Sequence, residues 1–97
     1  MARVVYSATA LDHLEHAFEA LRSLNPPVAG RAAQSIVSAV DALGAHPLLG
    51  LRIDGENREL IISIGETGFI ALYRFVLARD EVRVLAIRQQ RELGYMP

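Results

Sequence analysis

The segment of residues 58–88, RELIISIGETGFIALYRFVLARDEVRVLAIR, decides the fold. Its apolar residues recur with a period of two, and three runs rich in Ile, Val, Phe and Tyr predict strands over 58–64, 69–77 and 82–88. The connections 65–68 and 78–81 are short and are typical of hairpin loops. Three consecutive strands joined by tight turns predict an antiparallel meander.

The middle strand of this meander is apolar on both faces. Alternation places Phe69, Ala71 and Tyr73 on one face and Ile70, Leu72 and Arg74 on the other. A sheet with one face in water would instead alternate apolar and polar residues. Helices can cover one face, so we expect a partner chain or a second copy of this chain to shield part of the other.

The residues before the meander predict one strand and two helices. A β-prone run at 3–6 is followed by Ser7, a suitable N-cap, and by a helical spacing of apolar residues over 8–22. Asn25 and Pro26 end this helix and begin a second one, which Gly44 ends. The fold class is therefore α+β in the order β-α-α-β-β-β, with a helical hairpin packed on a small antiparallel sheet.

The composition limits the class of protein. The chain has 97 residues, of which 52% are apolar, and a net charge of −1, which indicates one folded domain over residues 1–97. Cysteine is absent, which excludes a disulfide scaffold and a cysteine nucleophile. No charge-free stretch approaches the roughly 20 residues that a spanning helix needs. We expect a soluble, cytoplasmic protein with no membrane segment.

In this order and spacing, four short stretches resemble the RelE/ParE toxins of type II toxin–antitoxin pairs. The stretches are Val-Tyr-Ser at 5–7, Arg-Glu-Leu at 58–60, Ala-Leu-Tyr-Arg at 71–74 and Val-Leu-Ala-Ile-Arg-Gln-Gln-Arg-Glu at 84–92. The last stretch is similar to the ParE subgroup, in which Ile-Arg-His-x-Arg-Glu followed by Gly-Tyr is common. The resemblance implies a toxin held inactive by an antitoxin that wraps its apolar grooves. ParE-like members act on DNA gyrase, whereas RelE-like members cut messenger RNA on the ribosome.

The two activities need different residues. RNA cleavage without a metal needs a proton acceptor, cations on the phosphate and an acid for the leaving oxygen. If the chain is a ribonuclease, the candidate catalytic residues are Arg74, Arg88 and Tyr95. Alternation along the last strand predicts that Arg88 shares a face with Val82, Val84 and Ala86.

Structural roles stay open for the same residues. Arg74 can form an ion pair with Glu59, Arg88 can be a solvated strand end or an antitoxin contact, and Tyr95 can be a packed aromatic of the tail.

Several features argue against catalysis. Lysine, which many RelE-like members use in their basic site, is absent, and Gln89 stands where relatives often have a histidine. His13 and His16 have a spacing that can hold a metal, but no third ligand is evident, so we interpret both as residues of a surface helix face. We therefore expect no catalytic residues, no metal and no other cofactor.

Three function classes remain. The first is a gyrase inhibitor that binds its target through Arg88, Arg91 and Tyr95 and is neutralised by a cognate ParD-like antitoxin. The second is a ribosome-dependent ribonuclease, and the third is a non-toxic relative that only binds the antitoxin. The net charge of −1 argues against direct nucleic-acid binding. We expect the antitoxin to contact the first helix and the exposed sheet face, at Leu11, Leu14, Glu15, Phe18 and Arg74.

Overall fold

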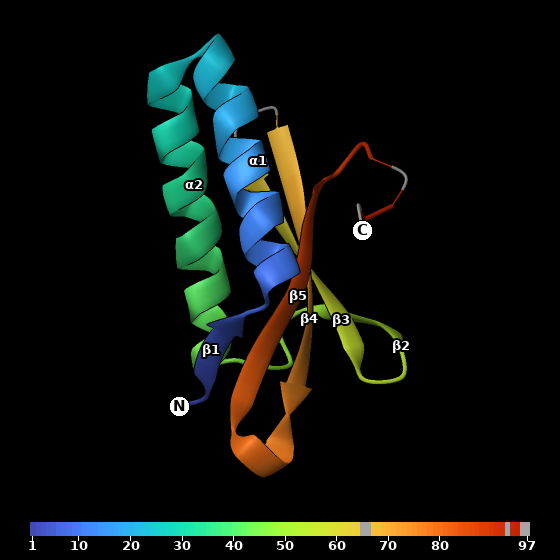
Figure 1. The fold of residues 1–97 in the computed structure, drawn as a ribbon. Helices are drawn as coiled ribbons and strands as arrows, with labels where there is room; N and C mark the ends of the chain where they lie inside the picture. Colours follow the sequence, from blue (N-terminus) through green and yellow to red (C-terminus); the bar gives the residue numbers. More distant parts are fainter. Residues whose placement is uncertain (65–66, 93, 96–97) are drawn as a thin grey trace.

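The computed structural model describes residues 1–64, 67–92 and 94–95. Two helices pack side by side on one face of a five-stranded sheet (Figure 1). The strand order across the sheet is β1-β5-β4-β3-β2. The elements are β1 (Arg3–Tyr6), α1 (Ala8–Leu24), α2 (Pro26–Asp41), η1 (Ala42–Gly44), β2 (Leu51–Asp54), β3 (Asn57–Ile64), β4 (Thr67–Val76), η2 (Leu77–Arg79) and β5 (Glu81–Gln89).

The helical hairpin forms as predicted, except that α2 ends at Asp41 and the 3-10 helix η1 covers the residues from there to Gly44. Two polar side chains set the start of α1 and the boundary between α1 and α2. The Ser7 hydroxyl accepts a hydrogen bond from the Ala10 amide and caps the start of α1. The Asn25 amide N–H donates to the Leu21 carbonyl at the end of α1, and the Asn25 side chain accepts from the Val28 amide in the first turn of α2.

The sheet confirms the meander and adds two features. β3, β4 and β5 pair antiparallel, but β1 pairs parallel with β5, so the sheet is mixed rather than wholly antiparallel. A further strand, β2, pairs with β3 and covers residues for which no strand was predicted. Its sequence alternates apolar and polar residues, but all four residues are exposed, so no alternation of buried and exposed positions accompanies the pattern.

The hairpin loops differ in detail from the prediction. β3 and β4 pair as far as residue 64 opposite residue 67, and residues 65 and 66 of the predicted 65–68 loop lie outside the described residues. The loop between β4 and β5 is η2 followed by Asp80, whose φ of 46° lies in the left-handed region. Aspartate tolerates that conformation better than most residues with a side chain.

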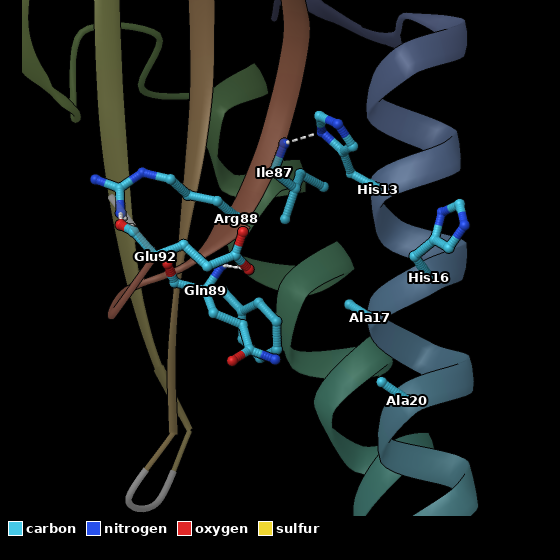
Figure 2. Close-up of a pocket in the computed structure, with 9 residues that line it drawn as sticks. His13, His16, Ala17, Ala20, Ile87, Arg88, Gln89 and Glu92 are labelled. Carbon is cyan, nitrogen blue, oxygen red and sulfur yellow. Dashed lines mark hydrogen bonds between the residues drawn. The ribbon is translucent and has the colours of Figure 1, made fainter. Parts of the chain in front are cut away.

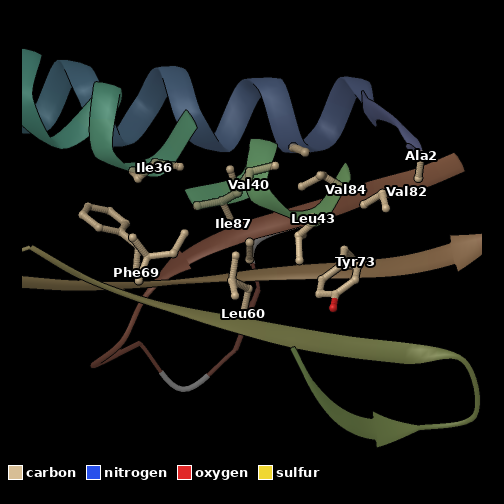
Figure 3. Close-up of a cluster of buried hydrophobic side chains, with 13 residues drawn as sticks. Ala2, Ile36, Val40, Leu43, Leu60, Phe69, Tyr73, Val82, Val84 and Ile87 are labelled. Carbon is tan, nitrogen blue, oxygen red and sulfur yellow. The ribbon is translucent and has the colours of Figure 1, made fainter. Parts of the chain in front are cut away.

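The core lies between the helices and one face of the sheet (Figure 3). α2 contributes Ile36 and Val40, and the sheet contributes, among others, Phe69, Tyr73 and Val84, all at most 1% exposed. We call the opposite face of the sheet the open face. Within the described residues no helix lies on it, and the alternate positions that point to it include Glu59, Ile61, Leu72, Arg74 and Arg83.

Candidate functional site

A bulge in β5 decides where its C-terminal residues point. The pairing of β4 with β5 shifts by one residue at Leu85, which has no partner across the described ladder. An extra residue reverses the alternation of faces beyond it. The prediction that Arg88 shares a face with Val82 and Val84 is therefore wrong. Those two valines are buried under the helices, whereas Arg88 lies with Ala86 on the open face.

Two side chains from the N-terminal part of the chain bond to the backbone around this bulge. The Ser7 hydroxyl donates to the Leu85 carbonyl at 3.0 Å. The His13 Nδ1 atom accepts a hydrogen bond of 3.0 Å from the Ile87 amide, which lies beyond the end of β1 (Figure 2). His13 is only 5% exposed, so its interpretation as a surface residue is wrong. It is a buried residue that holds α1 to β5.

Arg88 fixes the chain that follows β5. Its side chain is 16% exposed and points away from α1 (Figure 2). Its Nη2 atom lies 3.9 Å from the Glu59 carboxylate, and its guanidinium carbon lies 5.2 Å from the centre of the Tyr95 ring. Its Nη1 atom donates to three carbonyl oxygens of the following turn, those of Gln89 at 3.3 Å, Gln90 at 3.3 Å and Glu92 at 2.6 Å.

Tyr95 returns to the sheet and completes this cluster. Its hydroxyl donates to the Glu59 carboxylate at 2.8 Å. Burial, followed by the hydrogen bond to Glu59, raises the pKa of Tyr95 above its ordinary value. The phenol is therefore protonated at neutral pH and acts as a hydrogen-bond donor. Glu59, Arg88 and Tyr95 form one packed unit, which we call the tail cluster.

The other two candidate arginines lie outside the tail cluster. Arg91 is exposed, and its Nε atom makes a long contact of 3.4 Å with the Gln89 side chain. Arg74 is also exposed and donates to Asn57, not to Glu59. It lies four residues along β4 from the position opposite Arg88, roughly 13 Å at the usual rise of a strand. The structure thus joins Arg88 with Tyr95 but leaves Arg74 apart from both.

The expected antitoxin residues fall on two different surfaces. Leu11 is 51% exposed and Glu15 is exposed on α1, whereas Leu14 and Phe18 are half-buried. Arg74 lies on the open face, with the sheet between it and α1. A partner that contacts all five residues has to reach both sides of the sheet.

A pocket of about 280 Å³ lies between α1 and the end of β5 (Figure 2). Ala17 and Ala20 of α1 form one wall and leave space because their side chains are small. Ile87 lies on the opposite side with Gln89 and Glu92, and the Glu92 carboxylate accepts a hydrogen bond of 3.1 Å from the Gln89 amide. The pocket therefore combines an apolar wall with polar groups that belong to the turn after β5.

Two further features bear on the class of site. Among the described residues, no three His, Asp or Glu side chains come close enough to hold a metal ion. Over the same part of the chain, no helix combines the length and the apolar character needed to cross a membrane.

Comparison with known proteins decides the family. The model of the ParE toxin of the type II toxin–antitoxin system parDE matches residues 4–94. The chain belongs to the ParE toxin family. Its ParE fold is similar to a chain of the chromosomal ParDE TA system from P. aeruginosa, with a TM-score of 0.73 and 24% identity over 92% of this chain and 96% of that one.

A second solved structure shares the fold at lower sequence identity. A chain of the intact E. coli RelBE toxin–antitoxin complex gives a TM-score of 0.59 with 14% identity, over 95% of this chain and 100% of that one. No curated protein sequence gives a match. The resemblance to RelE/ParE toxins and the α+β fold are confirmed, and this chain is a ParE-type toxin of a type II toxin–antitoxin system.

Proposed function

We propose that this ParE-type toxin inhibits DNA gyrase and is neutralised by a cognate ParD-like antitoxin. The match to the ParE family over residues 4–94 carries the proposal. The chemistry of the site supports an inhibitor over a ribonuclease. Arg88 packs against the Tyr95 ring, and both side chains contact the Glu59 carboxylate. The raised pKa of Tyr95 disfavours its use as a general base.

In this proposal Arg91 makes the direct contact with gyrase, while Arg88 and Tyr95 position the turn that carries it. Arg91 is exposed, whereas Arg88 is 16% exposed and half-buried Tyr95 is bonded to Glu59. Arginine is frequent among residues that dominate binding energy at protein interfaces. An exposed guanidinium on a fixed turn suits that role.

A DNA supercoiling assay with purified gyrase and the antitoxin-free toxin tests the target. We expect loss of supercoiling with the wild type, and a roughly tenfold higher inhibitory concentration for Arg91→Glu. Arg31→Glu is the matched control, because Arg31 is an exposed arginine on α2. Normal supercoiling together with cuts in messenger RNA on translating ribosomes would refute the gyrase assignment and favour a ribonuclease.

The antitoxin part of the proposal rests on the apolar exposure of α1. Leu11 is 51% exposed, and Leu14 and Phe18 follow it at helical spacing and are half-buried, so together they offer a partner an apolar strip along α1. We expect Leu11→Asp to weaken binding of the co-expressed cognate antitoxin by about tenfold or more. Val37→Asp is the control, since Val37 is 38% exposed on α2. Equal binding by both variants and the wild type would remove α1 from the interface.

A further inference from the structure

Two arginines lie directly opposite each other on the open face. Arg74 of β4 pairs directly with Arg83 of β5. The Cβ atoms of two residues paired in this way lie about 5 Å apart. Like charges in directly opposed positions destabilise a sheet. Such a pair is therefore a cost to the isolated chain, and an anionic ligand between the two side chains would offset it.

A buried carboxylate holds the cluster in place. Glu81 is 5% exposed and contacts Arg3 Nη2 at 2.5 Å with one oxygen and Arg83 Nε at 2.6 Å with the other. Arg3 lies opposite Glu81 on the neighbouring strand β1. Glu81 thus fixes two guanidinium groups while leaving them accessible, because the side chains of Arg3 and Arg83 are 74% and 43% exposed.

The third guanidinium points to the same surface and is less constrained. Arg74 is exposed, and its Nη2 atom donates to the Asn57 side chain at 3.2 Å. Asn57 in turn donates to Asp54 at the edge of the sheet at 3.0 Å. The strands β1, β4 and β5 therefore carry three arginines at this end of the open face, of which Arg3 and Arg83 contact Glu81 and Arg74 does not, and Asp54 lies on the edge strand β2.

The neighbouring side chains select the class of ligand. Val5 lies opposite Arg83 and is 37% exposed, and Leu72 is the next open-face residue of β4 after Arg74 and is half-buried. Nucleic-acid surfaces combine strong positive charge with aromatic side chains that stack on bases, whereas this chain has a net charge of −1 and valine and leucine beside the arginines. Carboxylates next to apolar side chains match this surface better.

We propose that Arg3, Arg74 and Arg83 form a carboxylate-binding site that takes an acidic, apolar peptide segment of a protein partner. The site lies on strands β1, β4 and β5 at the end of the sheet away from Arg91. Because Arg74 is also an expected antitoxin contact, the inference rests on the antitoxin part of the proposed function and extends it to Arg3 and Arg83. Guanidinium groups bind carboxylates with paired, charge-assisted hydrogen bonds.

Fluorescence anisotropy with labelled eight-residue peptides tests this site. The probes are Glu-Glu-Leu-Leu repeats, the uncharged Gln-Gln-Leu-Leu repeats and a short DNA duplex. We expect the acidic peptide alone to bind, and Arg74→Gln to weaken its binding by about tenfold. Arg31→Gln is the control because Arg31 is exposed on α2. Since Arg74 is exposed and its side chain donates a hydrogen bond to the side chain of Asn57 at the surface, its variant should keep the thermal midpoint of the wild type.

Three results would overturn the proposal. Failure of the acidic peptide to bind would remove the site, and equal losses in Arg74→Gln and Arg31→Gln would reduce it to general charge attraction. Tighter binding of the duplex than of the acidic peptide would assign the arginines to phosphate instead. None of these results depends on gyrase, so the supercoiling assay can fail or succeed independently.

Discussion

Tyr73→Phe removes a single buried hydroxyl that joins two parts of the fold. Tyr73 has no exposed surface, and its hydroxyl accepts a hydrogen bond from the Gly50 amide at 2.8 Å and donates one to the Pro47 carbonyl at 2.8 Å. Both partners belong to the segment that leads into β2. A Cβ atom at Gly50 would lie 2.6 Å from the Tyr73 ring, so the approach is already close and the segment cannot simply collapse into the space.

The expected loss of stability follows from these two contacts. The variant leaves the buried Gly50 amide without its acceptor and the half-buried Pro47 carbonyl without its donor. An unsatisfied buried polar group costs about 1–3 kcal/mol, and water can reach part of the Pro47 side, so we expect a loss of roughly 2–3 kcal/mol. For a domain of this size that corresponds to a fall in the thermal midpoint of about 10–20 °C.

Urea denaturation followed by circular dichroism measures this change, and Tyr6→Phe is the matched control. The Tyr6 hydroxyl is buried but has no hydrogen-bond partner among the described residues, and burial, with a smaller contribution from Asp41, raises its pKa to about 12. We expect its removal to be neutral or slightly stabilising. A loss below about 0.5 kcal/mol in Tyr73→Phe, or equal losses in the two variants, would refute the reasoning.

Three further predictions concern charge and anchoring. The hydrogen bonds that Glu81 accepts from Arg3 and Arg83 lower its pKa from 4.5 to about 2. The ionised carboxylate therefore stabilises the fold above pH 4.5, and this contribution is lost as the pH falls from about 4.5 to about 2. Glu81→Gln should therefore lose less stability than the wild type between pH 5 and about 3 in denaturation experiments, and parallel curves would contradict this. Arg88→Met should speed amide hydrogen exchange in the turn after β5 by about tenfold, because three carbonyls lose their donor, whereas Arg91→Met should not. His13→Leu should cost about 1–3 kcal/mol because a buried amide loses its acceptor, while His16→Leu on the exposed side of α1 should cost under about 0.5 kcal/mol, as measured by urea denaturation.

Most of the fold could be predicted from the sequence because local signals agreed with one another. Ser7 and Asn25 cap the helices as their residue types suggest, and the period of two in 58–88 marks the three long strands. β2 was missed, although Leu51–Asp54 alternates apolar and polar residues, because four residues are the shortest run in which that alternation indicates a strand. Its residues Leu51 and Ile53 are 64% and 47% exposed, so the strand owes its place to pairing with β3 and not to burial.

The site was harder to predict because one extra residue in β5 reverses which face of the sheet the following side chains point to. Leu85 is apolar like its neighbours, and nothing in its sequence context distinguishes a bulge from a regular strand. His13 could have been recognised, since it is spaced by three and four residues from Ala10 and Ala17 on the buried side of α1. A histidine on such a stripe is buried with an acceptor or donor to satisfy, and here that partner is the Ile87 amide.

The same bulge separates the two ends of the open face into surfaces of different character. Beyond the bulge, Arg88 points to the open face and belongs to the tail cluster, in which the Glu59 carboxylate balances its charge and the Tyr95 ring packs against its guanidinium group. Before it, Arg83 faces Arg74 and remains accessible. If β5 were regular, Arg88 would lie on the helix-covered face, and a charge there would have to be buried under α1 at a prohibitive cost. The bulge therefore allows a strand with arginines on both sides of Leu85 to keep an apolar core under the helices and to place both Arg83 and Arg88 on the open face.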